Sequence, residues 1–233
     1  MVLMQHETMI LFWWLMFGGS HIIGSSLPVR DFFISRLSIP GFKIIYSLVA
    51  LATFVPLCYV FFNNAHAGYL FYNPGYIIKL TAHFIMLGAI TVLLQALVTS
   101  NPMTTMAELS GRVVSRAQGI QRITRHPQNF AFGLFGLAHL LATPSAGDWM
   151  FFGGFIVFGI LSSMHQDRRM LAAGSAQAKQ FLDDTSAVPF AAIIKGKQRL
   201  APGEYHPPAL AAAVVLFILI RLLHPLLFGG FGG

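Results

Sequence analysis

Histidines inside long apolar runs are the residues of this chain with the clearest chemical potential. His21, His83 and His139 each stand in a stretch with few other ionisable groups. Ionisable side chains are costly in a hydrocarbon environment, so they are candidates for functional sites. An imidazole can hydrogen-bond a neighbouring helix, move a proton or ligate a metal. The spacing of their neighbours indicates which of these roles each histidine could take.

His21 is surrounded by small residues. It follows Gly18, Gly19 and Ser20, and Gly24 lies about one helical turn beyond it. Small residues allow a second helix or a flat ligand to approach the backbone closely. The pattern is therefore consistent with a ligand role and also with a close helix contact.

His139 shares one face of a predicted helix with Phe132, Phe135 and Gly136, because these residues precede it by seven, four and three positions. An imidazole flanked by phenyl rings and a glycine gap could hold a planar macrocycle, since haem is commonly held by histidine. An aromatic packing face with one hydrogen-bonded histidine is the alternative. For His83 a buried structural role is the favoured interpretation.

The polar run Arg-Ile-Thr-Arg-His-Pro, from Arg122 to Pro127, indicates a different chemistry. A proline favours an extended residue before it and suits the first turn of a helix, so a helix should begin here after an extended His126. A helix N-terminus with Arg122 and Arg125 beside it can bind an anion, such as haem propionates, a lipid phosphate or a carboxylate substrate. Ordinary headgroup contact is the alternative. Asp167 could pair with Arg125 or Arg168.

The composition indicates the environment in which these residues lie. Hydrophobic residues make up 55% of the 233 residues and charged residues only 10%, against about 25% in soluble domains. We therefore predict an all-α fold, a polytopic integral membrane helix bundle with about six transmembrane helices, forming a single domain over residues 1–233. The expected spans are residues 8–27, 41–62, 76–98, 128–142, 149–165 and 208–228.

Positive charge is concentrated in alternate connections between these runs. Nearly all Lys and Arg residues fall within segments 28–43, 112–125 and 168–199, which are predicted to be loops. The positive-inside rule places these segments in the cytoplasm and both termini outside it, which fits a bacterial inner membrane. The net charge of +7 is then explained by the lipid bilayer, and no nucleic-acid partner is expected.

Several chemistries are excluded. One cysteine, Cys58, allows no intramolecular disulfide, no cysteine-based zinc knuckle and no covalently attached c-type haem. The chain has no Ser-His-Asp spacing, no paired carboxylates in a span and no GxGxxG after a strand, so hydrolases and dinucleotide enzymes lack support. No Lys or Arg precedes Arg30, and the first apolar run is therefore expected to be a retained helix.

Taken together, these segments resemble the NnrU family, which includes the 15-cis-ζ-carotene isomerases. The likeness runs in order along nearly the whole chain, through Gly19-Ser20-His21, residues 119–128, Leu137-Ala138-His139, Asp167-Arg168-Arg169, residues 185–194 and His224-Pro225-Leu226. The Arg-Ile-Thr-Arg-His-Pro-Gln run is its most specific part.

The resemblance implies an integral membrane protein that binds haem b through two histidines. It maps the iron ligands, which would also be the catalytic residues, onto His21 and His139. Because these lie toward opposite sides of the membrane, their depths could differ by roughly 10 Å, and His83 is the substitute partner for His139. The candidate cofactor contacts are His21, His139, Phe135, Arg122, Arg125 and His126. Gly136 stands where the plant isomerases have a cysteine.

Three functions follow from these patterns. The first is a haem-dependent cis-trans isomerase of an apolar, lipid-soluble polyene, in which the reduced iron assists rotation about a double bond without net redox change. The second is a haem-containing accessory or sensor of nitric oxide and nitrite metabolism in denitrification. The third is an S-adenosylmethionine-dependent membrane methyltransferase, which the absence of a Glu-Glu pair opposes. Whether the chain is an enzyme, and whether it associates with other membrane proteins, stays open.

Overall fold

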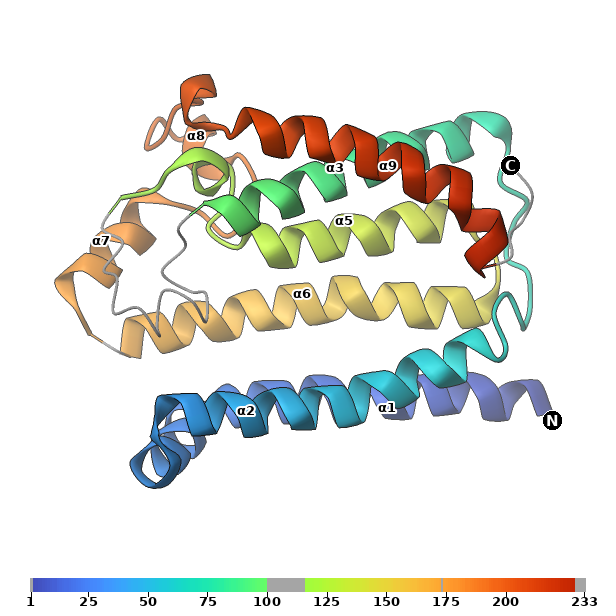
Figure 1. Ribbon diagram of the computed structural model, residues 1–233, viewed down its shortest axis with the longest axis horizontal. Coiled ribbons are helices and arrows are strands. Elements are labelled where there is room, and N and C mark those ends of the chain that lie inside the picture. The colour runs from blue at the N-terminus through green and yellow to red at the C-terminus, as the bar shows by residue number, and fades with distance from the viewer. Residues whose placement is uncertain (1, 100–115, 173, 229–233) are drawn as a thin grey trace. The chain divides into compact units, whose positions relative to one another are not determined.

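The protein is all-α, as the apolar runs predict. The structure, a computed structural model, describes residues 2–99, 116–172 and 174–228, so Arg112 of the second basic segment lies outside the described residues. The long helices are α1 (Val2–Ser25), α2 (Leu27–Phe62), α3 (Tyr76–Val98), α5 (Pro127–Ala142), α6 (Ala146–Ala172) and α9 (Pro207–Phe228), drawn in Figure 1. The short ones are η1 (Gly119–Arg122), α7 (Ala176–Asp184), α8 (Ala191–Ile194) and η2 (Pro202–Glu204).

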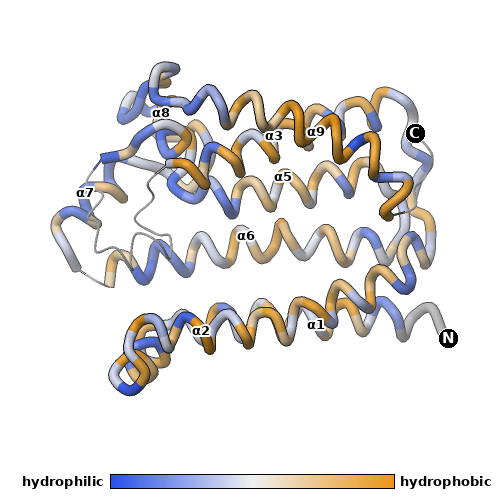
Figure 2. Tube along the Cα trace, viewed as in Figure 1, coloured by the Kyte–Doolittle hydropathy of each residue, from blue (hydrophilic) through white to orange (hydrophobic). Residues whose placement is uncertain are grey.

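Five of these helices are long and apolar enough to cross a membrane, namely α1 from His6 onward, α2, α3, α6 and α9. The chain is therefore an integral membrane protein. The fourth predicted span is also helical, but α5 has only 16 residues, which is about 24 Å against a hydrocarbon core of about 30 Å. Figure 2 shows apolar residues along the long helices and hydrophilic residues in α7 and around α8.

The first basic segment is not a loop, and this part of the prediction is wrong. Helix α2 begins at Leu27 and is interrupted only by a kink at Ser38, whose φ is 63° and ψ is 170°. The guanidinium of Arg36 lies over the ring of Phe32, 3.7 Å from its centroid. Long basic side chains can lay their apolar stems on a surface and keep the charge in water, so the charges here do not require a loop.

Contacts between Cα atoms divide the chain into two compact units. Unit 1 comprises residues 1–82 and 136–158, and unit 2 comprises residues 83–135 and 159–233. Each of the helices α3, α5 and α6 has one part in unit 1 and the other part in unit 2. The assignment of residues 1–233 to one domain stays a prediction.

The core of unit 1 is aromatic. The rings of Phe61 in α2 and Phe151 in α6 stack at 3.9 Å, and the indole of Trp14 in α1 donates to the Phe151 carbonyl at 3.1 Å. Gly154 makes room for that indole, because a Cβ at this position would lie 2.1 Å from the Trp14 ring. These contacts hold α1, α2 and the first half of α6 together.

Polar contacts fix the ends of the helices in unit 2. Gln95, near the end of α3, is almost fully buried and pairs with the backbone of His206, with N···O distances of 2.9 and 3.0 Å. Asn129 of α5 donates to the Ser163 hydroxyl of α6 at 3.0 Å. Buried polar groups of this kind need partners, and these pairs therefore set the positions of α3, α5, α6 and the start of α9.

Candidate functional site

His21 lies in an aromatic environment on α1. Its ring centroid is 4.6 Å from that of Tyr46, 5.3 Å from Phe17 and 5.3 Å from Phe158. The Nδ1 atom is buried and has no hydrogen-bond partner. A buried polar atom without a partner is costly, so a ligand that engaged this nitrogen would remove the cost.

The predicted face around His139 is confirmed for Gly136 and His139, which both contact Phe152 of α6. The imidazole of His139 stacks on the Phe152 ring, with centroids 4.0 Å apart and an angle of 10° between the planes. A Cβ on Gly136 would lie only 2.5 Å from the Phe152 carbonyl oxygen. A side chain at this position would therefore require α5 and α6 to separate.

His21 and His139 both belong to unit 1, but they contact α6 at different levels. His21 lies against Phe158 and His139 against Phe152. These phenylalanines are six residues apart, which corresponds to about 9 Å along a helix. The difference in depth indicated by the sequence thus remains in the structure, and joint ligation of one iron stays a prediction.

The other candidate residues belong to unit 2. His83 lies in α3 with its ring centroid 6.4 Å from that of Phe217 in α9, and Phe135 lies in the unit 2 part of α5. Arg122, Arg125 and His126 are in the segment before α5. Their contacts with unit 2 are described next, and a role of these residues toward a cofactor stays a prediction.

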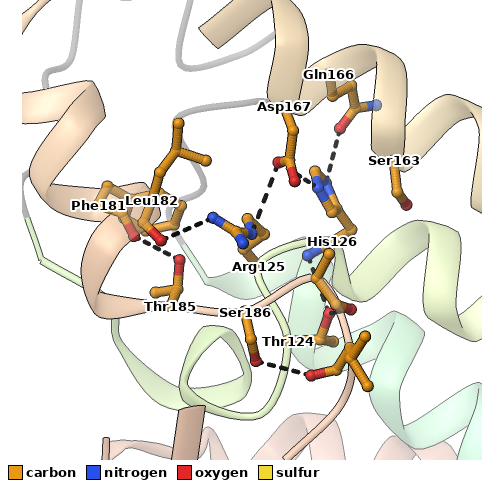
Figure 3. Close-up of polar contacts among 12 residues, drawn as sticks. Thr124, Arg125, His126, Ser163, Gln166, Asp167, Phe181, Leu182, Thr185 and Ser186 are labelled. Carbon is orange, nitrogen blue, oxygen red and sulfur yellow. Dashed lines mark hydrogen bonds and ion pairs between the residues drawn. The ribbon is translucent and has the colours of Figure 1, made fainter. Parts of the chain in front are cut away.

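The buried imidazole of His126 lies between two polar side chains of α6 (Figure 3). Its Nε2 atom is 2.8 Å from a carboxylate oxygen of Asp167, and its Nδ1 atom is 3.1 Å from the amide oxygen of Gln166. Helix α5 begins at Pro127, directly after His126, as predicted. The motif therefore fixes the start of α5 against the end of α6.

Arg125 approaches the same carboxylate, as the sequence indicated. Its Nε atom is 3.6 Å from Asp167, and its guanidinium donates to the Leu182 carbonyl at 2.9 Å. Burial lowers the pKa of Arg125, while the charges of Asp167 and Asp183 act in the opposite direction. The Arg125 backbone N–H also donates to Ser186 at 2.9 Å. Arg125 thus ties the connection after α7 to the start of α5.

Arg122 forms a bidentate ion pair with Glu204. The two N···O distances are 2.7 and 2.5 Å, and a third guanidinium nitrogen donates to Gln198 at 2.8 Å. The same carboxylate accepts the Gly119 backbone N–H at 2.7 Å. Such forked, charge-assisted contacts are strong and directional. They join η1 to the segment that leads into α9.

Changing Asp167→Asn should destabilise the protein, because it removes the charge facing His126 and Arg125. We expect a loss of about 1–3 kcal/mol in the free energy of unfolding, measured by thermal or denaturant unfolding in detergent. Asp31→Asn is the matched control, since Asp31 is largely exposed and its oxygen is 3.4 Å from Arg30. Equal stability of both variants would contradict a structural role for Asp167.

The Arg122–Glu204 pair should make stability depend on pH in the acid range. Hydrogen bonds from Arg122 and from the Gly119 backbone lower the pKa of Glu204 from 4.5 to about 2. The pair therefore contributes its full stability above pH 4.5, the ordinary pKa of the group, and loses it as the pH falls toward 2. Melting temperatures of the natural protein and of Glu204→Gln should differ at about pH 6 and converge only as the pH falls to about 2 or below, where the carboxyl group of the folded protein is protonated. A constant difference would contradict this assignment.

Sequence reasoning missed the partners of the histidines. Tyr46 donates its hydroxyl to the His21 carbonyl at 3.0 Å, and its ring fills the space beside Gly24, where a Cβ would lie 3.3 Å from the ring. Phe152 and Phe158 supply the rings against His139 and His21. These residues come from other helices, so no spacing within one helix could reveal them.

Comparison with known proteins agrees with the resemblance found in the sequence. A family model described as NnrU protein matches residues 9–230. Two curated relatives are both described as 15-cis-zeta-carotene isomerase, chloroplastic. The Zea mays protein is 34% identical over 113 residues, which are 47% of this chain and 31% of the relative.

The Arabidopsis thaliana protein is 31% identical over 115 residues, which are 48% of this chain and 31% of the relative. The matched stretch thus spans less than a third of either relative. No solved structure matches significantly. Because the family model covers nearly all of the apolar helices and both candidate histidines, this chain belongs to the NnrU family.

Proposed function

We propose that this protein is a membrane-embedded cis-trans isomerase of an apolar polyene of the carotenoid class. The names of the two curated relatives support this activity. The candidate membrane spans give such a substrate access from the bilayer. The observation that carries the proposal is that the aromatic core of unit 1 contains two histidines. A dry aromatic surface suits a conjugated hydrocarbon, which offers no polar groups to recognise.

We further propose haem b as the cofactor, held by His21 and His139. Among the described residues no group of three or more His, Cys, Asp or Glu could hold a metal ion. A haem would not need such a group, because the porphyrin supplies the equatorial ligands. The buried, unpartnered Nδ1 of His21 fits a ligand role. The ring of His139 stacks on Phe152, with centroids 4.0 Å apart.

The chemistry that a bound haem would supply is an iron centre of adjustable oxidation state beside the double bond that rotates. The protein's own residues would provide the surroundings. The ring of Phe17 lies 5.0 Å between centroids from each of Phe54 and Phe158, and these rings would exclude water near His21. The Tyr46 hydroxyl is occupied by the His21 carbonyl, so it would orient α1 and would not donate a proton to a substrate.

The orientation in the membrane is also a proposal. The basic segments would face the cytoplasm of a bacterial cell, namely residues 28–43 of α2, the residues around Arg122 and Arg125, and the connection between α6 and α9. Both termini would then lie outside the cytoplasm. Cysteine labelling of intact cells at the α2–α3 connection and at α7 would test this arrangement.

Two measurements on the purified protein test the function. An optical spectrum, oxidised and then reduced with dithionite, should show a haem Soret band. Reduced protein in liposomes should convert 15-cis-ζ-carotene to its 15-trans isomer, with haem-free protein as the control. A Soret band without conversion would refute the isomerase and leave the haem accessory or sensor role. A colourless protein from haem-replete cells would refute the cofactor.

A further inference from the structure

The segment between α7 and α9 exposes a group of large apolar side chains in unit 2. Val188 is 66% exposed, Phe190 45%, Ile194 83% and Leu200 53%. We call these four residues the 188–200 patch. The patch is not part of a candidate membrane span, so exposure to the hydrocarbon core does not account for it. Clustered apolar side chains outside a span usually mark an interaction surface.

The backbone beneath the patch is firmly held. The Phe190 N–H donates to the Ile123 carbonyl at 2.8 Å, the Thr124 hydroxyl donates to the Ala187 carbonyl at 2.9 Å, and Ala192 is almost fully buried. Its N–H donates to the Ser186 hydroxyl at 3.0 Å. Phe181 and Thr185, at the end of α7, are also buried. The apolar side chains therefore remain outside although the segment is anchored to the unit.

Phe190 has a backbone conformation that is rare for its residue type. Its φ is 63°, in the left-handed region that residues other than glycine seldom adopt. It directly precedes α8, whose last residue is Ile194, and both side chains are exposed. Strained conformations persist where the surrounding structure enforces them, often at functional positions. Here the conformation occurs at a position whose side chain is exposed.

The charges beside the patch are mainly positive. Lys195, Lys197 and Arg199 are exposed, and the Lys197 ammonium donates to the Asp183 carbonyl at 2.7 Å. The nearest carboxylates have cationic neighbours of their own. Glu204 is paired with Arg122, and the charge of Asp183 acts on Arg125. The charge of Arg199 also acts on Glu204, whose carboxylate is already paired with Arg122. Lys195, Lys197 and Arg199 together therefore leave net positive charge beside these apolar side chains.

The patch also lies at the end of unit 2 where helices enter and leave the membrane. Helix α3 ends close by, since Gln95 pairs with His206, and α9 begins at Pro207, soon after Leu200. The Phe190–Ile123 contact places the patch next to the start of α5. We infer that the 188–200 patch is a membrane-interface anchor, whose apolar side chains enter the headgroup region of an anionic leaflet while Lys195 and Arg199 contact lipid phosphates.

Site-specific fluorescence in liposomes tests this inference independently of the haem and of the isomerase activity. A probe is attached to Ile194→Cys in full-length protein that also carries Cys58→Ser, in vesicles of phosphatidylcholine and phosphatidylglycerol. Gln177→Cys is the aqueous control, because Gln177 is exposed on α7 in the same connection between α6 and α9. Ile218→Cys, within α9, is the control for a position in the span.

The probe at position 194 should be quenched by lipids that carry a nitroxide near the headgroup, and be at least about threefold less accessible to iodide than the probe at position 177. The probe at position 218 should respond to a deeper nitroxide. Iodide quenching at position 194 equal to that at position 177 would overturn the inference. Shielding from both iodide and lipid nitroxides would also overturn it, because a protein partner or a second copy would then cover the patch.

The preference of the 188–200 patch for anionic lipids is tested separately. Replacing both Lys195 and Arg199 with Gln should raise iodide access at position 194, and so should vesicles of phosphatidylcholine alone. Lys179→Gln with Arg168→Gln is the matched variant, since it removes two basic residues outside the patch, one in the last turns of α6 and one on α7. Equal access in all of these samples would refute the choice of an anionic surface.

Discussion

Protein carrying His21→Ala is expected to lose most of its Soret absorption. The change removes a proposed iron ligand and leaves the aromatic surroundings from Phe17, Tyr46 and Phe158 in place. Even outer partners of a metal ligand change metal affinity by about 10–100-fold, so loss of the ligand itself should weaken haem retention by at least that factor. The ratio of Soret to protein absorbance after purification measures the effect, and His139→Ala should behave in the same way.

His83→Ala is the matched control, because His83 is another histidine in a candidate span. If His21 and His139 hold the haem, this variant should keep its full absorbance. Loss of the band in His83→Ala together with retention in His21→Ala would instead assign the ligand pair to His83 and His139. Exogenous imidazole should partly restore the spectrum of His21→Ala, which a merely structural role for His21 would not predict.

Gly136→Ala should have the largest effect on stability among single-atom additions to α5. The added Cβ would lie 2.5 Å from the Phe152 carbonyl oxygen and 3.1 Å from the Ile156 side chain. Backbone atoms cannot move aside alone, so α5 and α6 must separate locally and the His139–Phe152 stack must loosen. Overpacking of this kind costs about 1–3 kcal/mol, which thermal unfolding in detergent would show as a lower melting temperature.

Gly133→Ala is the control on the same helix. A Cβ on Gly133 would meet no atom within 4 Å. Because alanine favours helix over glycine by up to about 1 kcal/mol, this variant should be as stable as the natural protein or slightly more stable. A melting temperature for Gly136→Ala equal to that of Gly133→Ala would show that the two helices are not packed as closely as described.

A short motif of charged residues can serve packing as well as ligand binding. The sequence indicated an anion site at Arg122 and Arg125, because free guanidinium groups beside a helix start attract anions. In the structure Arg122 is paired with Glu204, and Arg125 lies near Asp167. Both carboxylates are distant in the sequence from their partners. Only a tertiary contact could show that each arginine already has an anionic neighbour within the protein.

The sequence alone determined that the protein is surrounded by lipid and that its fold is all-α. Its apolar runs predicted an all-α membrane protein, and α3, α5 and α9 begin and end within a residue of the predicted spans. This succeeded because a helix in lipid must satisfy its backbone internally and must be apolar over a fixed length. The same reasoning failed between residues 28 and 40, where charge indicated a loop but a helix forms with a kink at Ser38.

The tertiary structure decided what surrounds each candidate residue. The apolar setting of His21 and His139 follows from the sequence, but their neighbours Tyr46, Phe152 and Phe158 come from other helices. Periodicity reports which residues share a face of one helix, whereas the partner of that face depends on how side chains of different helices interlock. For that reason the sequence could identify the histidines and Gly136 as candidates. Only the packing of α1, α2, α5 and α6 within unit 1 showed which residues they contact.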